Sequence, residues 1–452
     1  VLAGNLIVKS GGNLTFVNVT LIMNCSYTDE FSITIESGGI FKVVDGSNIT
    51  AYSSNAKFSL TAEGALTMKD SYLSRFSSFS IEGDNALLEN CSITHGSWVD
   101  ITADHVVVRK CNITDCYGGI VAEDCSDLTI EENRLTSLSW MAGIDLFVCD
   151  DVTIKDNHIS GGWSSGILLD WCSDVLISGN VIEDFGGSGI EVYSSDHVTI
   201  EDNTISNNGD VGLLIDSSGY TVIKDNKLVN DSILIEGYVE SHFVTHTIKG
   251  NTVNGKPVYC IVNQTFTTTY DVPSDAGEVL IINSTNVRAS DLDMNGADVL
   301  VEVAFSSDVT IHNVALEHGW YAVYVTMTST RVTIEGLRAE DVYYGAYTYS
   351  SSDITVNGAV LTSCEKGVVL ELTDVATISN VNVTDTFQGI YLFLSDHVTV
   401  SGCNLTSNMM GAYLFYSDDA LVEDCYFRDN HMGLRLYGCE RFTVRNNEFI
   451  KD

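Results

Sequence analysis

Proline and basic residues are scarce in this sequence. It has 2 prolines, Pro257 and Pro273, and 22 lysines and arginines against 61 aspartates and glutamates. Proline lacks the amide N–H that a sheet ladder needs, so its scarcity leaves room for long uninterrupted β-structure. The deficit of cations gives a net charge of −39. This charge excludes nucleic acid as a partner, because phosphate binding needs clustered lysine and arginine, and it repels acidic polysaccharides.

Long apolar segments are also missing. No run approaches the roughly 18 residues that a membrane span needs, and no signal peptide opens the chain. The sequence begins abruptly at Val1 and stops at Asp452, directly after a strand of a repeat. We therefore expect a processed or truncated piece, in which the lack of a signal carries no information about secretion.

Asn-x-Ser/Thr sequons favour an extracellular, glycosylated protein. The candidate glycosylation sites are Asn13, Asn18, Asn24, Asn48, Asn90, Asn112, Asn230, Asn263, Asn283, Asn382 and Asn404.

One phrase of about 22 residues recurs along the chain. Val152-Thr-Ile-Lys-Asp-Asn157-His-Ile159 returns as Val175-Leu-Ile-Ser-Gly-Asn180-Val-Ile182 and as Val198-Thr-Ile-Glu-Asp-Asn203-Thr-Ile205. Its apolar residues alternate with period two, as in strands, and no helical spacing of three and four occurs. Three short strands and three turns fit such a length, and parallel stacking satisfies the backbone of each coil. The sequence predicts an all-β, right-handed parallel β-helix solenoid of about 20 coils.

A second strand precedes each phrase and opens with glycine. In the second half these glycines are one 22-residue repeat apart: Gly345, Gly367, Gly389, Gly411 and Gly433. We expect the glycines to adopt a turn geometry that is closed to other residues. We also expect Ile390 and Leu392 to face the core.

The period breaks once, in the stretch that holds both prolines. We therefore predict one continuous solenoid in three parts: an N-terminal run of coils over residues 1–253, an insertion with an irregular coil over 254–286, and a regular run over 287–452.

The insertion carries the more specific resemblance. With Asn251-Thr-Val-Asn-Gly-Lys-Pro-Val-Tyr259 and Ala276-Gly-Glu-Val-Leu-Ile-Ile-Asn-Ser-Thr-Asn-Val287, the chain resembles the right-handed parallel β-helix proteins of the NosD-like, copper-accessory type, in the form common in archaeal surface proteins. The resemblance covers essentially the whole chain. It implies the fold and an extracytoplasmic location, and it implies function weakly, because sugar hydrolases, lyases, adhesins and structural proteins share this repeat.

Metal ligands do not converge in the sequence. His242 and His246 are the only close histidines, and on a strand they would lie about 13 Å apart. Met409 and Met410 would point to opposite sides, and the absence of Cys-x-x-Cys disfavours zinc. We therefore expect no cofactor, with Ca²⁺ possible only if turn acids converge; those acids are Glu131, Glu132, Asp156, Asp202 and Asp225.

Two sets of repeated residues have structural interpretations. An asparagine ladder is expected to hold one corner through amide hydrogen bonds; its members are Asn133, Asn157, Asn180, Asn203, Asn226 and Asn251. Cys125, Cys149 and Cys172 share one coil position and are expected to be buried thiols. Cys91 with Cys111, and Cys403 with Cys425, are left open between buried thiols and disulfides.

Catalytic motifs are missing. Carboxylate pairs are plentiful on an acidic β-helix, so they do not discriminate. The Gly-His-Gly and Arg-x-Lys motifs expected of a polygalacturonase-like enzyme do not occur, and Asp150-Asp151 and Asp418-Asp419 begin strands of the repeat. We therefore expect no catalytic residues; if the chain is an enzyme, it is a polysaccharide lyase or glycoside hydrolase.

An aromatic stripe is the one feature that the core does not explain. On outward positions of the glycine-led strands lie Tyr347, Tyr349, Tyr391, Phe393, Tyr413, Phe415 and Tyr437. The matching positions of the first half are mixed, with Asp145, Phe147, Asp170, Glu191, Tyr193 and Asp216. Outward rings contact a partner, form a platform for sugars, or are covered by another segment or subunit.

Together these observations favour a non-catalytic extracellular or cell-surface protein, structural or adhesive, that assembles with itself or with other surface proteins into a filament or surface layer. The alternative is a carbohydrate-binding or polysaccharide-processing β-helix protein.

Overall fold

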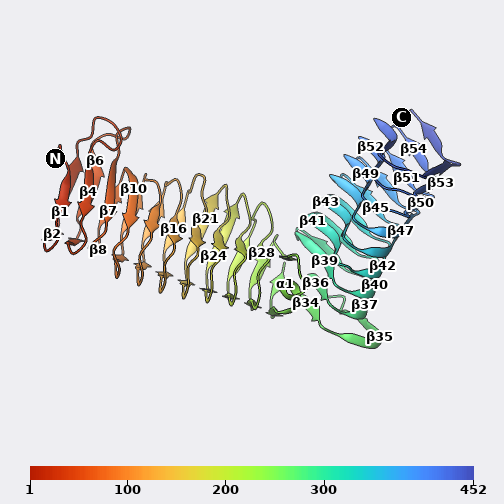
Figure 1. Ribbon diagram of the computed structural model, residues 1–452, viewed down its shortest axis with the longest axis horizontal. Coiled ribbons are helices and arrows are strands. Elements are labelled where there is room, and N and C mark those ends of the chain that lie inside the picture. Colours follow the sequence, from red (N-terminus) through yellow and green to blue (C-terminus); the bar gives the residue numbers. More distant parts are fainter. Residues whose placement is uncertain (452) are drawn as a thin grey trace. The chain divides into compact units, whose positions relative to one another are not determined.

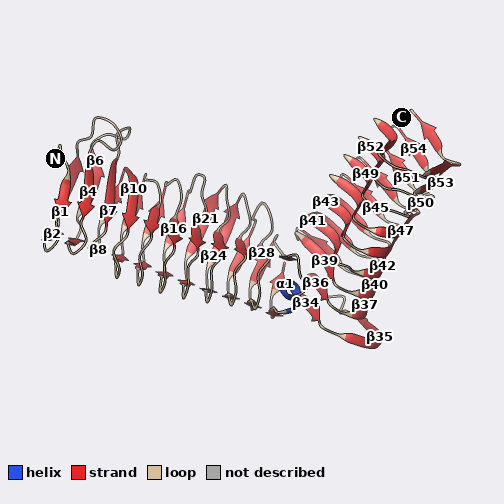
Figure 2. Cartoon of the chain, viewed as in Figure 1, coloured by secondary structure: helices blue, strands red, loops and turns tan. Residues whose placement is uncertain are grey.

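A computed structural model describes residues 1–451, and its ribbon consists almost entirely of short parallel strands (Figures 1 and 2). The chain forms a parallel β-solenoid of about 19 turns with about 22 residues per turn, so the predicted fold class is confirmed. Two compact units divide it. Unit 1 comprises residues 1–226 with 245–247, and unit 2 comprises 227–244 with the residues from 248 onward. Each unit is described by itself below.

Unit 1 consists of three parallel sheets, and each coil contributes one strand to each sheet. The first sheet contains β1 (Leu6–Val8), β4 (Ser32–Ile35), β7 (Phe58–Ala62), β10 (Phe76–Ile81), β13 (Val99–Ile101), β16 (Ile120–Glu123), β19 (Ile144–Phe147), β22 (Ile167–Asp170), β25 (Ile190–Tyr193) and β28 (Leu213–Asp216). The second contains β2 (Asn13–Val17), β5 (Ile40–Val44), β8 (Ala65–Lys69), β11 (Leu87–Glu89), β14 (Val107–Arg109), β17 (Thr129–Glu131), β20 (Thr153–Lys155), β23 (Leu176–Ser178), β26 (Thr199–Glu201) and β29 (Val222–Lys224). The third contains β3 (Thr20–Met23), β6 (Asn48–Ala51), β9 (Tyr72–Ser74), β12 (Ser92–Thr94), β15 (Asn112–Thr114), β18 (Arg134–Thr136), β21 (His158–Gly162), β24 (Val181–Phe185) and β27 (Thr204–Ser206).

Unit 2 opens with β30 (Lys227–Val229), β31 (Ile233–Glu236), the short helix α1 (Ser241–Val244) and β33 (Thr252–Val253), with β32 (Thr247–Lys249) at its boundary. Its first sheet contains β34 (Lys256–Val262), β36 (Glu278–Ile282), β39 (Val299–Ala304), the later parts of β41 (Ala315–Thr326) and β43 (Arg338–Tyr349), and β46 (Lys366–Glu371), β49 (Gln388–Phe393), β52 (Met410–Phe415) and β55 (Met432–Tyr437). The second contains β35 (Thr265–Asp271), β37 (Thr285–Ser290), β40 (Ser307–His312), β42 (Thr330–Glu335), β44 (Ser352–Asn357), β47 (Asp374–Ser379), β50 (Thr399–Ser401), β53 (Leu421–Glu423) and β56 (Thr443–Arg445). The third contains β38 (Asp293–Asn295), the early parts of β41 and β43, and β45 (Val360–Thr362), β48 (Asn382–Thr384), β51 (Asn404–Thr406), β54 (Tyr426–Arg428) and β57 (Glu448–Ile450).

Identical side chains stack in register inside the coils. Ile144, Ile167 and Ile190 pair across β19, β22 and β25, and all three are fully buried. Burying such a side chain stabilises the fold by about 1.5–3 kcal/mol relative to leaving it exposed. Ile390 and Leu392 are also fully buried, as predicted. The period-two alternation of the sequence therefore builds one column of core residues after another.

The glycines that open the strands of the first sheet have a different role from the predicted one. Gly345, Gly367, Gly389 and Gly411 do not lie in the left-handed region of backbone space, so the expectation of a special turn geometry is wrong. Instead, a Cβ on each would lie 2.4–2.6 Å from the carbonyl oxygen of the glycine one coil further along. Glycine is required here because adjacent coils approach each other too closely for a side chain.

The stretch predicted as an insertion, residues 254–286, holds an antiparallel pairing of β33 with β34 before parallel coils resume with β34 on β36 and β35 on β37. The three-part division drawn from the sequence stays a prediction. No helix within residues 1–451 is long and apolar enough to cross a membrane.

Candidate functional site

The asparagine ladder forms a chain of buried amides in unit 1. Asn157, Asn180 and Asn203 are each at most 2% exposed. The Asn157 Nδ2 donates to Asn180 Oδ1 at 3.0 Å, and the Asn180 Nδ2 donates to Asn203 Oδ1 at 3.0 Å. Each Nδ2 also donates to a backbone carbonyl of the preceding coil, such as Ile130 O at 2.9 Å from Asn157. Asn133 and Asn226 continue the ladder in unit 1, and Asn251 is equally buried in unit 2. These contacts give the amides a structural role.

The acids next to the asparagine ladder lie in the turn at the same corner of the coil. Asp156, Asp202 and Asp225 have positive φ angles of 53°, 57° and 55°, a conformation that aspartate and asparagine tolerate better than most residues. Part of the acidity of the chain therefore follows from its turns. Within residues 1–451 no three His, Cys, Asp or Glu side chains converge to hold a metal ion, so the Ca²⁺ expectation has no support.

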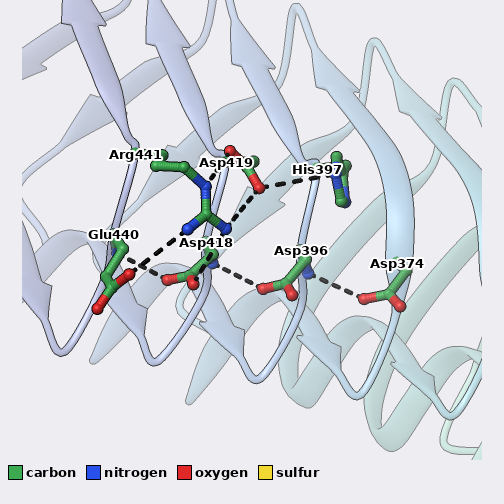
Figure 3. Close-up of polar contacts among 7 residues, drawn as sticks. All are labelled: Asp374, Asp396, His397, Asp418, Asp419, Glu440 and Arg441. Atoms are coloured by element: carbon green, nitrogen blue, oxygen red, sulfur yellow. Dashed lines mark hydrogen bonds and ion pairs between the residues drawn. The ribbon is translucent and has the colours of Figure 1, made fainter.

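A second row of acids lies along a turn of unit 2 and is shown in Figure 3. The Asp374 and Asp396 carboxylates accept the backbone N–H of the residue one coil further along, at 2.9 and 2.7 Å. Arg441 binds both oxygens of Asp419 at 2.9 Å and also reaches Asp418 Oδ2 at 3.4 Å. The Arg441 hydrogen bonds lower the pKa of Asp419. These carboxylates bind backbone and arginine, which again indicates a structural role.

All twelve cysteines, which lie within residues 1–451, are free thiols in the structure. Cys125, Cys149 and Cys172 are buried on successive coils, with 3.2 Å between the Cys125 and Cys149 sulfurs. The hydrogen bond with Cys125, together with burial, raises the pKa of Cys149 to about 12. The pairs Cys91–Cys111 and Cys403–Cys425 are buried as well, and a disulfide in either pair stays a prediction.

The two close histidines do not share a strand, so that expectation is wrong. His242 lies in α1, where its Nδ1 accepts the Tyr238 N–H at 3.4 Å. His246 follows the helix, and its Nδ1 accepts the Thr221 N–H at 3.3 Å. Both imidazoles hold backbone groups of the chain.

The predicted aromatic residues lie on the first sheet of unit 2. Tyr391 and Tyr413 occupy one register position, with ring centroids 5.6 Å apart. Phe393, Phe415 and Tyr437 occupy another, with successive centroids 5.5 and 5.1 Å apart and nearly parallel planes. Tyr347 and Tyr349 hold the same two positions on β43. The coil between them carries Val369 and Glu371 instead, so the column of rings has one gap.

Sequence reasoning missed three further rings. Tyr321, Tyr324 and Tyr344 join Tyr347 in a cluster with centroids 4.9–5.6 Å apart. The sequence reasoning followed positions after the strand-opening glycines, and it missed these rings because Tyr344 precedes Gly345 and because β41 has Ala322 at the position of the glycine. The predicted seven residues and these three are called the aromatic face below.

Charged side chains connect the parts of the aromatic face. The Lys366 Nζ lies 5.5 Å from the Tyr344 ring centroid and 4.9 Å from that of Tyr391, which places the cation across the gap. Arg435 lies 4.8 Å from the centroid of Tyr413, and each such contact contributes about 0.5–1 kcal/mol at an exposed site. Burial raises the pKa of Tyr344 to about 12.

One end of the same sheet is covered by the segment that contains β31. All residues of β36 and β39 are buried on both sides, and carboxylates from these two strands accept backbone N–H groups of β31. Glu278 accepts the Ile233 N–H at 3.2 Å, and Glu302 accepts the Ile235 N–H at 3.2 Å. Burial raises the pKa of both glutamates well above the ordinary value.

Unit 1 carries a smaller group of perturbed acids on the outer side of its first sheet. Burial, and then the nearby Asp170 and Glu191 carboxylates, raise the pKa of Asp145. Burial also raises the pKa of Asp170, whose Oδ1 has no hydrogen-bond partner among the described residues. Phe147 lies on the strand of Asp145, Tyr193 lies on that of Glu191, and Asp216 lies on the next strand, β28.

The sequons all lie at the surface. Nine of the eleven asparagines are exposed, and Asn48 and Asn283 are partly exposed. A glycan could be attached without disturbing the core, and which sequons carry one stays a prediction.

Two family profiles match the chain. A right-handed β-helix region matches residues 4–167 and 97–253, which together exceed half of the chain. The profile described as periplasmic copper-binding protein (NosD) matches residues 259–430 and 376–452. The expected handedness and NosD-like character are confirmed, and the archaeal style stays a prediction. The residues present do not fit a copper centre built from His, Cys, Asp or Glu, since no three such side chains converge within residues 1–451.

Solved structures show only distant likeness. Tailspike protein 3 of bacteriophage CBA120 is 11% identical with a TM-score of 0.22; the match covers 98% of this chain but 56% of the tailspike, so the chain spans little more than half of that protein. The mannuronan C-5 epimerase A-module of Azotobacter vinelandii is 8% identical, covers 99% and 91% of the two chains, and has a TM-score of 0.20. An alginate lyase from Paenibacillus sp. is 11% identical, covers 72% and 96%, and also has a TM-score of 0.20. Likeness at this level carries no argument about activity. A comparison with curated proteins found no match.

Proposed function

The chain belongs to the family of right-handed β-helix repeat proteins, and from this premise we propose that it is a non-catalytic, extracytoplasmic surface protein that binds a partner through its aromatic face. We take the first partner to be a second copy of the chain, so that copies assemble into a filament or surface layer. The periplasmic description of the NosD profile and the surface position of every sequon support the location.

The aromatic face is the observation that carries this proposal. Its rings lie on the outer side of a rigid sheet whose inner side is packed with residues such as Ile390 and Leu392. Tyr437 is 49% exposed, and Tyr391 and Phe415 are partly exposed. Stacked rings on fixed strands lose little conformational entropy on binding, and contiguous apolar patches of this kind mark contact surfaces.

Self-association tests the proposal. We expect the purified chain to form larger species with rising concentration in sedimentation velocity and to show assemblies by electron microscopy. The double variant Tyr391→Ala, Tyr413→Ala should remain monomeric, because it removes two adjacent rings from the centre of the face. The control Tyr52→Ala removes a 69% exposed ring outside the face and should assemble like the wild type. A wild type that stays monomeric at all concentrations, or a double variant that assembles normally, contradicts the proposal.

Polysaccharide processing is the second candidate, and Asp145 is the observation that favours it. A carboxyl with a raised pKa beside a second carboxylate is the arrangement in which an acid donates a proton to a leaving sugar oxygen, and Asp145 lies near Asp170 and Glu191. Release of reducing ends or unsaturated uronates from a polysaccharide panel, abolished in Asp145→Asn, would establish this candidate and reject the non-catalytic proposal. No activity from the wild type removes it.

A further inference from the structure

A groove of about 470 Å³ lies in unit 2, beside the aromatic face. Three aromatic residues and three acids dominate its lining: Trp320, Tyr343, Phe387, Asp341, Glu365 and Asp385. Its floor includes the buried Cys364. None of these six residues belongs to the aromatic face, the asparagine ladder or the groups of acids described above.

The coil register places the rings of the groove in one column. Tyr321 pairs with Tyr344, and Tyr344 with Lys366, so their predecessors Trp320, Tyr343 and Glu365 also follow each other along the solenoid. Phe387 holds the same position one coil further along. The Trp320 and Tyr343 centroids are 5.0 Å apart with planes 29° from parallel, and Tyr343 and Phe387 are 40% and 44% exposed. The column therefore presents two stacked rings, then the Glu365 carboxylate and the Phe387 ring, on the outside of the coil.

The charge of the groove selects among possible ligands. The three carboxylates offer oxygens that accept hydrogen bonds. The Nε2 of His318 lies 3.5 Å from an oxygen of Asp341. A uronate or sulfated chain would be repelled by these acids and by the net charge of −39. A sugar without acidic groups offers hydroxyl donors at its edges and an apolar face to the rings.

The same corner of the coil repeats this combination in unit 1. Trp140 and Trp163 precede the glycine-led strands β19 and β22, as Tyr343 precedes the glycine-led part of β43. Their centroids are 6.4 Å apart with planes 22° from parallel, and the two rings are 63% and 76% exposed. Asp145 and Asp170 follow on those strands. Stacked rings therefore precede a glycine-led strand in both runs of coils.

We propose that the groove of Trp320, Tyr343 and Phe387 binds a non-acidic glycan chain, with sugar faces on the rings and hydroxyls on Asp341, Glu365 and Asp385. This inference rests on the proposed surface-binding function and names the chemical class of one ligand. The groove is continuous with the aromatic face, because the Tyr343 and Tyr344 ring centroids are 4.7 Å apart.

Isothermal titration calorimetry of the full chain tests the groove. The probes are hexamers of glucose, N-acetylglucosamine, glucosamine and guluronate, with a lysine hexapeptide as a cationic peptide. We expect at least one of the first two hexamers to bind and guluronate not to bind. Trp320→Ala and Tyr343→Ala should each weaken binding at least tenfold, whereas Tyr343→Phe keeps the ring and should bind like the wild type. The matched control Trp171→Ala removes a 63% exposed tryptophan elsewhere and should leave binding unchanged.

Three outcomes would overturn the glycan groove. They are no binding of either neutral hexamer, neutral binding that survives both alanine variants, or binding confined to glucosamine and the lysine peptide, which would indicate a general cation site. Thermal melts that match the wild type show that a loss is not due to unfolding, and Tyr343→Phe separates a missing ring from a disturbed fold. Self-association is measured separately with the Tyr391→Ala, Tyr413→Ala variant, so failure of the groove and failure of the aromatic face are distinguishable.

Discussion

Replacing Asn180 with alanine removes one amide from the middle of the asparagine ladder, and the structure allows the cost to be worked out group by group. The Asn180 Oδ1 accepts the backbone N–H of Asn157 at 2.9 Å, and its Nδ2 donates to the Ile154 carbonyl at 2.9 Å. Both backbone groups are buried, and both lose this partner in the variant. The neighbouring amides lose one bond each but keep another, as Asn157 Nδ2 does with Ile130 O.

A buried polar group left without a partner costs about 1–3 kcal/mol. The Asn157 N–H becomes such a group, whereas the Ile154 carbonyl belongs to the ladder between β20 and β23. We therefore expect a loss of about 2 kcal/mol in the free energy of unfolding. Urea unfolding followed by circular dichroism measures the total. Because long repeat arrays depart from two-state behaviour, hydrogen exchange should be measured too. We expect faster exchange mainly in the coils around residues 154–203.

The control is Asn295→Ala, which removes an exposed amide that bonds to Glu317 at 3.1 Å. It should change stability by no more than about 0.5 kcal/mol. The reasoning is refuted if Asn180→Ala unfolds at the same urea concentration as Asn295→Ala, with unchanged exchange around the ladder. In that case the ladder amides would contribute little to stability, and other contacts would hold the corner of the coil.

Three further predictions concern other parts of the fold. The pKa of Glu302 is raised in the folded chain, so its neutral form stabilises the fold fully below the unfolded pKa near 4.5, and this contribution is lost as pH rises through the folded pKa. The variant Glu302→Gln should therefore show a smaller fall of melting temperature between pH 5 and pH 9 than the wild type. An unchanged fall would show that Glu302 is already charged in the folded chain. Burial raises the pKa of Cys116 and of Cys364 to about 11, so iodoacetamide at pH 8 should modify neither thiol until denaturant is added. Peptide mass spectrometry follows the modification. Rapid modification of either thiol in the folded protein would contradict its burial. Gly411→Ala should lower the melting temperature by several degrees, because the added Cβ would lie 2.5 Å from the carbonyl oxygen of Gly433 on the next coil. In the control Gly4→Ala the added Cβ meets nothing within 4 Å, so the melting temperature should change little. Equal melting temperatures of the two variants would refute the close approach of the coils.

The repeat could be predicted from sequence because coil structure is local. Each coil buries residues such as Ile154, Ile177 and Ile200 at the same register position. The alternation of apolar and polar residues along the chain therefore predicts which side chains face the core. The corner asparagines were found for the same reason. What packs onto the outside of a coil is not local. Glu278 stands in the apolar run Glu278-Val-Leu-Ile-Ile282, and nothing nearby in the chain indicates that β31 covers it.

The candidate site was predicted in part. The aromatic face was visible where a glycine opens the strand, as at Tyr391 and Tyr413, and invisible in β41, where Ala322 lies at the position of that glycine. The groove was missed because Trp320 lies in the middle of β41 and Phe387 lies in a turn, whereas the sequence reasoning followed only the strand positions that come after the glycines. Their proximity follows from the register of the strands beside them.

The asparagine ladder has a consequence for how such a chain changes length. Every rung takes a hydrogen bond from one neighbour and gives the same kind of bond to the other, so all rungs are interchangeable. A coil that is duplicated or deleted between two rungs leaves both of its former neighbours with equivalent partners. Inside a strand, a gain or loss of one residue would turn the side chains that follow in that strand to the opposite side. In a turn it is absorbed, since successive rungs are 24 residues apart at Asn133–Asn157 and 23 at Asn157–Asn180. Length variation among relatives should therefore come in whole coils or in turns, and tandem duplication is the simplest route by which the array could have grown.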